Sequence, residues 1–216
     1  MPCAIDRITI GLPLASSLDG WQKRLTAYHE IGHAILMTLL ENAAPLNRVS
    51  IIPRSSGLAG FAQTIPDEEN VDSDSLSRAW ILDNITYTLG GRAAEVEIFG
   101  SAEVATGVKS DLERATYLAR QMVRYGMSDF RNVVLEPTEY FSAEYSVEMG
   151  NKIDREVRAI LESCYQRART IIREYRALID RLVDVLIEQE TIEGEQFRQL
   201  VEEYHRSITK TVISNG

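Results

Sequence analysis

Two of the three histidines in this 216-residue chain lie four residues apart, as His29 and His33 in the stretch TAYHEIGHAILMTLL. Residues at this spacing on a helix lie one above the other on the same face, so both imidazoles can reach a single metal ion. Glu30 directly follows the first histidine. The alternative is an apolar helix on which two histidines fall by chance, but buried histidines without partners would be costly. The pattern therefore predicts a metal site with a carboxyl group beside it.

The chemistry expected of such a site is peptide-bond hydrolysis. A zinc ion held by two neutral imidazoles and one carboxylate keeps a net positive charge, and an open fourth position lets it lower the pKa of a bound water to about 7. Glu30 can take the proton as general base while this water attacks a peptide carbonyl that the ion polarises. Glu30 then returns the proton to the leaving amine, so no covalent intermediate is required.

The spacing of residues does not decide the third metal ligand. An extended form of the motif requires glycine three and histidine six residues after His33, and leucines occupy both positions. The remaining histidine, His205, lies near the C-terminus in EEYHRS, where we expect a solvated helix residue. The chemistry therefore requires a downstream carboxylate, either Glu95 in LGGRAAEVEIFG or Asp111 in ATGVKSDLERAT. Both remain open at this point.

A helix in the middle of the molecule must hold the two histidines. It is expected to follow an irregular segment of residues 1–20 and to run to about Glu41. Apolar side chains surround it on nearly all sides, as Ile31, Ala34, Ile35, Leu36, Leu39 and Leu40. Gly32 would let another backbone approach this helix closely. We therefore expect the histidines to be enclosed by other elements.

Short strands and further helices are expected around this helix. NRVSIIP and GLAGFAQTIP are rich in strand-forming residues and bounded by proline and glycine, which predicts a small sheet. Residues 74–98 return to helical spacing, interrupted by two adjacent glycines. Residues 111–125 form another predicted helix, with Ser110 as its N-cap.

Long amphipathic helices with few breaking residues follow from about Ala143. One of them has an apolar face at helical spacing, formed by Ile153, Val157, Ile160, Leu161 and Cys164. The predicted fold class is therefore mainly α, with a small β-sheet beside the histidine helix and a C-terminal helical bundle.

Charge and composition narrow the classes of partner. The net charge is −9, from 32 acidic and 23 basic residues, which disfavours nucleic acid or an anionic membrane surface as a partner. No apolar run approaches the length of a membrane span. Cys3 and Cys164 have no CxxC spacing, so neither a disulfide framework nor a thiolate zinc site is indicated. We expect Cys164 to be a small apolar residue on a helix face.

Five segments occur here in the order typical of one known family: AYHEIGHA, VSIIPR, GGRAAE, ATGVKSDLERAT and ETIEGEQF. Over about residues 4–205 the chain resembles the C-terminal protease domain of the FtsH family of ATP-dependent, membrane-anchored zinc metalloproteases. The resemblance implies one zinc ion per chain, with His29, His33 and Asp111 as ligands. Glu95 then becomes a candidate to orient a ligand histidine from outside the metal.

The resemblance also implies a division of the chain and a set of partners. Residues 1–20 resemble a joining segment left from an upstream ATPase module, 21–142 the zinc-binding catalytic part, 143–208 a C-terminal helical part and 209–216 a tail. ATP would act only through that ATPase module, which is absent from this chain together with the membrane anchor. The chain itself is expected to be soluble. Full-length relatives are expected to form homo-hexamers that degrade damaged or short-lived membrane and soluble proteins from the cytoplasmic, stromal or matrix side.

Gly60, Phe61 and Ala62 lie in the strand that we predict to bind substrate. An extended peptide can pair with the exposed backbone of such an edge strand, although an ordinary core strand would have a similar sequence. Two other functions remain: a catalytically silent assembly module of the same fold, and a helical binding domain with an accidental metal motif. The intact HEIGH motif with Asp111 argues against the first, and metal analysis would test the second.

Overall fold

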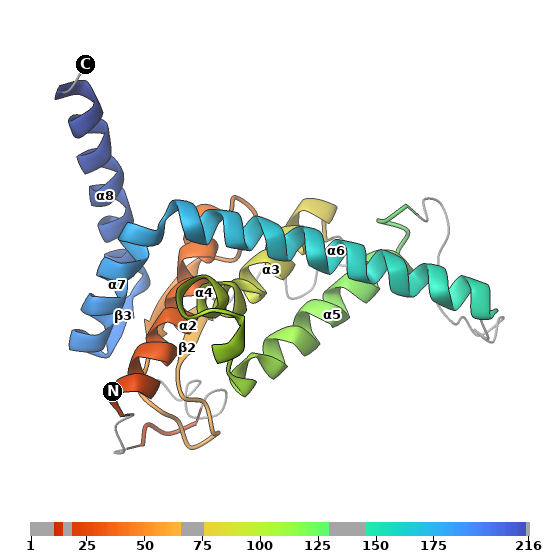
Figure 1. Ribbon diagram of the computed structural model, residues 1–216, viewed down its shortest axis with the longest axis horizontal. Coiled ribbons are helices and arrows are strands. Elements are labelled where there is room, and N and C mark those ends of the chain that lie inside the picture. Colours follow the sequence, from red (N-terminus) through yellow and green to blue (C-terminus); the bar gives the residue numbers. More distant parts are fainter. Residues whose placement is uncertain (1–10, 15–18, 66–75, 130–145, 215–216) are drawn as a thin grey trace.

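The computed structural model describes residues 11–14, 19–65, 76–129 and 146–214. It is mainly helical, with one small antiparallel sheet beside the helix that carries the histidines (Figure 1). The predicted mainly α fold class with a small sheet is therefore confirmed. Most of the expected joining segment, 1–20, and Cys3 within it lie outside the described residues. Within the described ranges, no helix combines the length and the apolar character that a membrane span requires.

Helix α2 (Gly20–Leu39) carries both histidines through the middle of the molecule (Figure 1). It begins where the side chain of Asp19 accepts a hydrogen bond of 2.9 Å from the N–H of Gln22. It ends close to the predicted boundary. Residues on several of its sides are fully buried, among them Ala27, Ile31, Ala34, Ile35 and Leu36. The predicted central helix is therefore confirmed.

Helices α3 (Arg78–Thr88) and α4 (Gly90–Phe99) form the predicted interrupted helical segment, with Leu89 as the joint between them. Helix α4 crosses α2 where Gly32 faces Gly90. A Cβ atom on either glycine would lie 2.5 Å from the carbonyl oxygen of the other, so neither position has room for a side chain. The close backbone approach expected at Gly32 is confirmed, and it brings α4 directly against the histidine helix.

The sheet has three antiparallel strands in the order β2-β1-β3: β1 (Leu46–Ser50), β2 (Phe61–Thr64) and β3 (Thr191–Glu193). β1 and β2 confirm the two predicted strands. β3 was not predicted, because it is only three residues long and pairs with a strand far away in the sequence. Helix α8 (Gly194–Ser214) follows it directly, and a Cβ atom at Gly194 would collide with the carbonyl oxygen of Leu46.

Helix α5 (Lys109–Arg124) follows two 3-10 turns, η1 (Ser101–Glu103) and η2 (Thr106–Val108). The prediction of Ser110 as its N-cap is wrong. Val108 occupies the cap position with helical backbone angles, φ −68° and ψ −4°, so the 3-10 turn continues into the helix without a break. No side chain accepts a hydrogen bond at this cap. Local cap chemistry therefore does not set the start of α5.

Helices α6 (Val147–Glu174) and α7 (Arg176–Gln189) and helix α8 form the C-terminal part, and the C-terminal half of α8 projects away from the rest of the molecule (Figure 1). The predicted apolar face of α6 is confirmed, since Val157 and Cys164 are buried and the other three members pack against them. Residues of α6, α7 and α8 also join α2 in one core cluster, among them Ala168, Ile172, Leu182 and Phe197. Helix α8 remains helical to Ser214, within the range expected as a tail.

Candidate metal centre

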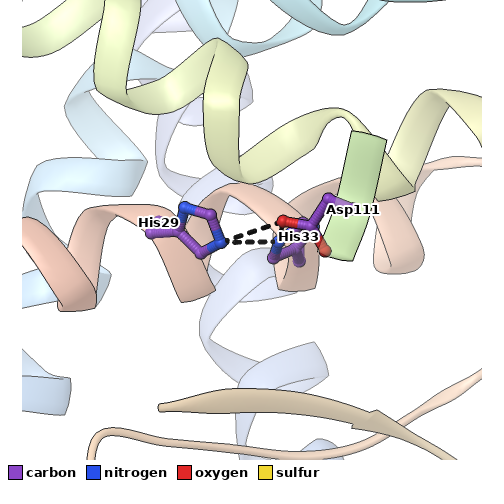
Figure 2. Close-up of side chains that lie close together, drawn as sticks. All are labelled: His29, His33 and Asp111. Atoms are coloured by element: carbon purple, nitrogen blue, oxygen red, sulfur yellow. Dashed lines mark hydrogen bonds and ion pairs between the residues drawn. The ribbon is translucent and has the colours of Figure 1, made fainter. Parts of the chain in front are cut away.

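His29, His33 and Asp111 converge in the structure, although α5 brings the aspartate from far along the chain (Figure 2). The two Nε2 atoms lie 3.1 Å apart. The Oδ2 atom of Asp111 lies 3.2 Å from Nε2 of His29 and 3.4 Å from Nε2 of His33. In the part of the chain that the structure describes, these three residues form the one group of three or more that could hold a metal ion.

Hydrogen bonds on the far side of each ring fix which nitrogen faces the centre. Nδ1 of His33 lies 2.8 Å from the carbonyl oxygen of Tyr87, which can only accept, so this Nδ1 carries the hydrogen. Nδ1 of His29 lies 2.7 Å from Oε1 of Glu95 and donates to that carboxylate. In the neutral rings both Nε2 atoms therefore present lone pairs to each other and to Asp111. Three such electron-rich atoms at these distances require a proton or a cation between them.

The pKa values of the centre report the same arrangement. Burial by itself lowers the pKa of His29, but the carboxylates of Asp111 and Glu95 outweigh it and raise the pKa to about 10. Burial likewise opposes ionisation of Asp111, yet the two imidazoles hold the pKa of its carboxyl well below its usual range. Even so, no donor among the described residues reaches Oδ2 of Asp111 in hydrogen-bonding geometry. A cation bound between the three atoms would satisfy this oxygen.

The spacing and types of the three atoms fit zinc. Zinc bonds of about 2.0–2.1 Å at tetrahedral angles place ligand atoms about 3.4 Å apart. The three separations here range from 3.1 to 3.4 Å. Two imidazole nitrogens and one carboxylate oxygen are also a donor set that zinc accepts, with a fourth position left open.

Glu95 lies behind His29 and not among the converging atoms. Its side chain is buried in α4, with 1% of the residue exposed. While Oε1 accepts from His29, Oε2 accepts a hydrogen bond of 2.7 Å from the backbone N–H of Ala105. One carboxylate therefore holds both the ring and the loop that precedes α5. The position is the one expected for a residue that orients a ligand histidine.

Two further residues that shape the centre were missed in the sequence. Tyr87 supports His33 through its backbone carbonyl, and such a contact leaves no signature in the residue type. A Cβ atom at Gly91 would lie 2.5–2.6 Å from three ring atoms of His29, so only glycine leaves room for the imidazole there. The paired glycines that begin α4 were visible in the sequence, but the sequence did not show that His29 packs against Gly91.

Glu30 is buried between α2 and β2, with 7% of the residue exposed. Burial raises the pKa of its carboxyl, while the nearby His29 and His33 and a backbone hydrogen bond from Ala62 oppose the rise. Gly60 leaves the room for this side chain, since a Cβ atom there would lie 2.9 Å from Cγ of Glu30. The carboxyl group is thus near the two histidines and tied to the neighbouring strand.

The strand predicted to bind substrate is an edge of the sheet. The N–H of Ile65 donates to the carbonyl of Pro45 at 2.8 Å, so alternate residues of β2 face β1. Ala62, one of the intervening residues, turns its backbone outward to Glu30. The guanidinium groups of Arg48 and Arg54 lie over the ring of Phe61, 5.4 Å and 4.9 Å from its centroid. Of the three predicted residues, Gly60 and Ala62 therefore lie next to the catalytic carboxyl candidate, whereas Phe61 contacts the two arginines.

His205 lies outside this group. It is exposed on α8, beside the ring of Tyr175 at a centroid distance of 5.6 Å. The expectation of a solvated helix residue is met, and the third histidine takes no part in the candidate centre.

Relatives of known name match nearly the whole chain. It is 41% identical over 96% of its length to a protein from Thermotoga maritima, 41% over 93% to one from Trieres chinensis and 42% over 92% to one from Pseudothermotoga lettingae. Each of these proteins is named ATP-dependent zinc metalloprotease FtsH. The chain spans only about a third of their length, 32–35%.

The sequence model of Peptidase family M41 matches residues 16–200. The match includes the histidine helix, the sheet, the loop before α5 and most of the C-terminal helices. Because it covers most of the chain, and all four candidate residues His29, Glu30, His33 and Asp111 lie within it, the chain belongs to peptidase family M41.

Proposed function

We propose that this chain is the zinc-dependent endopeptidase part of a longer protein. The observation that carries this function is the convergence of His29, His33 and Asp111 beside the buried Glu30. His29, His33 and Asp111 would hold one zinc ion, whose chemistry when bound is to polarise the peptide carbonyl and to acidify water. The relatives are named zinc metalloproteases, which supports the same choice of metal.

Glu30 moves the proton in this proposal. Its carboxylate accepts a proton from the attacking water and hands it to the leaving amine, so one group serves both steps. Burial, which raises the pKa of Glu30, makes the carboxyl a better proton acceptor than an exposed glutamate. The hydrogen bond from Ala62 keeps the carboxyl oriented between the histidines and the strand.

The substrate is an extended polypeptide segment that pairs with β2. Backbone pairing holds a peptide with little regard to its side chains, which suits a protease of many substrates. The support is that β2 is an edge strand, and that Ala62 faces Glu30 from it. Gly60, Phe61 and Ala62 would then lie beside the peptide bond to be cleaved.

The longer protein is proposed to add energy-driven unfolding to this hydrolysis. The relatives are about three times as long and are named ATP-dependent, which supports an ATPase module upstream of residues 1–20. Residues 21–142 would supply catalysis and 143–208 contacts within a homo-hexameric ring. We infer that the full-length protein is membrane-anchored, with this part on the cytoplasmic, stromal or matrix side, and degrades damaged or short-lived membrane and soluble proteins.

The test combines metal analysis with one substitution. The purified chain should hold about one zinc and cleave a permanently unfolded protein, whereas Glu30→Gln should keep the zinc and lose cleavage, because an amide cannot accept the proton. Glu41→Gln, the same chemical change at an exposed position just after α2, is the matched control and should cleave normally. A chain without zinc would favour a plain helical binding domain. Zinc without cleavage in the unaltered chain would favour a silent assembly module.

A further inference from the structure

The segment that carries Asp111 is anchored on both sides by residues that also support the histidines. Before it, the N–H of Ala105 donates to Oε2 of Glu95, whose Oε1 accepts from His29. After it, a terminal nitrogen of Arg114 donates to the hydroxyl of Tyr87 at 3.2 Å, and the carbonyl of the same tyrosine accepts from His33. The three candidate ligands thus share one connected set of supports.

Asp111 depends on these anchors because little else fixes its position. It lies in the first turn of α5, which begins from a 3-10 turn without a side-chain cap. The next three residues of the helix, the last of them Arg114, are exposed, and the first fully buried one is Ala115. Before the helix, Val108 is buried. The aspartate itself is only half-buried. Apolar packing therefore holds the N-terminal turn of α5 at Val108 and Ala115 only, and polar contacts must fix Asp111 between them.

Tyr87 is a rigid point of attachment for this turn. The residue is buried, with 5% exposed, and packs in the same core cluster as α2. Its hydroxyl accepts the hydrogen bond from the guanidinium of Arg114. Arg114 lies one turn after Asp111 on the same helix. Its contact with Tyr87 consequently ties the aspartate to the carbonyl that orients His33.

We propose that Arg114 is a positioning residue that acts through Tyr87 to hold Asp111 against the two histidines. The inference rests on the proposed zinc site and adds a residue to it that touches neither metal nor substrate. Removing a side chain that supports a metal ligand in this way lowers metal affinity about ten- to a hundredfold. We expect the lower end for Arg114, because Glu95 still holds the segment on its other side.

The sign of the effect separates positioning from charge. Arg114 is a cation near a site for a dication, so electrostatics alone predicts that its removal strengthens zinc binding. Positioning predicts that its removal weakens binding. Because the two causes have opposite signs, the direction of the change identifies which one dominates.

The test is a set of zinc affinities, measured by competition with a chromophoric chelator on the full chain. Arg114→Ala and Tyr87→Phe should each weaken zinc binding about tenfold. The double variant should bind zinc no more weakly than either single variant, because both substitutions remove the same hydrogen bond. Tyr87→Phe keeps the carbonyl that supports His33 and nearly all of the ring volume. Arg114→Lys should regain part of the affinity, since an ammonium can also donate to the hydroxyl. Arg120→Ala is the control on the same helix, because Arg120 makes only a surface ion pair of 3.7 Å with Asp154 among the contacts described.

One further measurement excludes a role of Arg114 in substrate binding. Saturating zinc should restore peptide cleavage by Arg114→Ala to near that of the unaltered chain, which would not happen if Arg114 bound the substrate. Equal or tighter zinc binding by Arg114→Ala would overturn this inference alone. Absence of zinc binding by the unaltered chain would overturn the proposed function together with it.

Discussion

Two carboxylates contact His29 from opposite sides of the ring. Asp111 faces Nε2 at 3.2 Å, and Glu95 faces Nδ1 at 2.7 Å. Nε2 of His29 is the atom that faces His33. Asp111 therefore lies on the side of the ring where a metal would bind, whereas Glu95 lies on the opposite side. In the sequence, spacing alone could not separate them.

Substitution should distinguish these two acids by zinc affinity. Asp111→Asn is expected to lose zinc and cleavage together, because a neutral amide oxygen is a much weaker zinc ligand than the carboxylate. Glu95→Gln should weaken zinc binding only about ten- to a hundredfold, since the ring loses support but keeps its nitrogen. Zinc titration of both variants measures the difference. A greater loss in Glu95→Gln than in Asp111→Asn would transfer the ligand role to Glu95.

Zinc binding should also release a proton from the centre. Without a metal the pKa of His29 is about 10, so the ring is protonated at neutral pH. The zinc ligand must be the neutral ring, and one proton therefore leaves per zinc bound at pH 7. Since lower pH favours the competing proton, zinc affinity should fall as pH falls. Calorimetry in buffers of different ionisation enthalpy counts the protons, and a heat independent of the buffer would contradict the assignment.

At the scale of elements, the contact between α2 and α4 sets the frame of the centre. The crossing of Gly32 and Gly90 lets α4 approach so closely that Glu95 and Gly91 both reach His29. A side chain at the crossing would have to push two helix backbones apart, because the nearest atom on the other helix is a backbone carbonyl oxygen and not the end of a flexible side chain. The close packing of α2 and α4 at Gly32 and Gly90 therefore determines how α4 supports His29.

Substituting the crossing glycine should destabilise the fold. Gly32→Ala places a methyl group 2.5 Å from the carbonyl oxygen of Gly90, and overpacking of this kind costs about 1–3 kcal/mol. Gly150→Ala in α6 is the matched control, because nothing lies within 4 Å of a Cβ atom there. That control should be neutral or slightly stabilising, by up to about 1 kcal/mol, from helix propensity. Chemical denaturation of the two variants compares the costs, and equal stabilities would show that the crossing can relax.

Local patterns predicted the elements that depend on local chemistry. The apolar surroundings of His29 and His33 indicated a central helix, and both strands bounded by proline and glycine are present. β3 escaped prediction because its pairing with β1 is distant in sequence. The contact between Tyr87 and His33 also joins residues that are distant in the sequence, so it could not be predicted either. For the same reason the choice of the third ligand stayed open until the family resemblance favoured Asp111. Ser110 was misplaced because a 3-10 turn, and not a cap, starts α5.

At the scale of the whole molecule, the histidine helix and the C-terminal helices share one core. Ile31 of α2 and Leu182 of α7 belong to the same cluster, and β3 completes the sheet from the C-terminal side. Tyr28, which directly precedes His29 in the sequence, donates a hydrogen bond of 2.7 Å from its hydroxyl to Asp180 of α7. The geometry of the candidate centre therefore depends on residues well beyond the catalytic segment.

A folded chain of this kind should hydrolyse peptides but should not unfold proteins. Hydrolysis at a zinc centre uses no nucleotide, and these 216 residues contain no G-x-x-x-x-G-K-[ST] phosphate loop. A stable substrate exposes an extended segment only by opening, which costs up to its full unfolding free energy of about 5–15 kcal/mol. We therefore expect slow cleavage of a destabilised substrate and none of its tightly folded form, with or without ATP.

One substrate in two forms, folded and destabilised, gives the measurement. Both are incubated with the zinc-loaded chain, in the presence and absence of ATP, and Glu30→Gln serves as the blank for contaminating proteases. Cleavage of the destabilised form should be the same with and without nucleotide, because the hydrolytic step does not use it. Loss of the folded form that depends on ATP would mean that this chain contains a nucleotide site and couples it to unfolding.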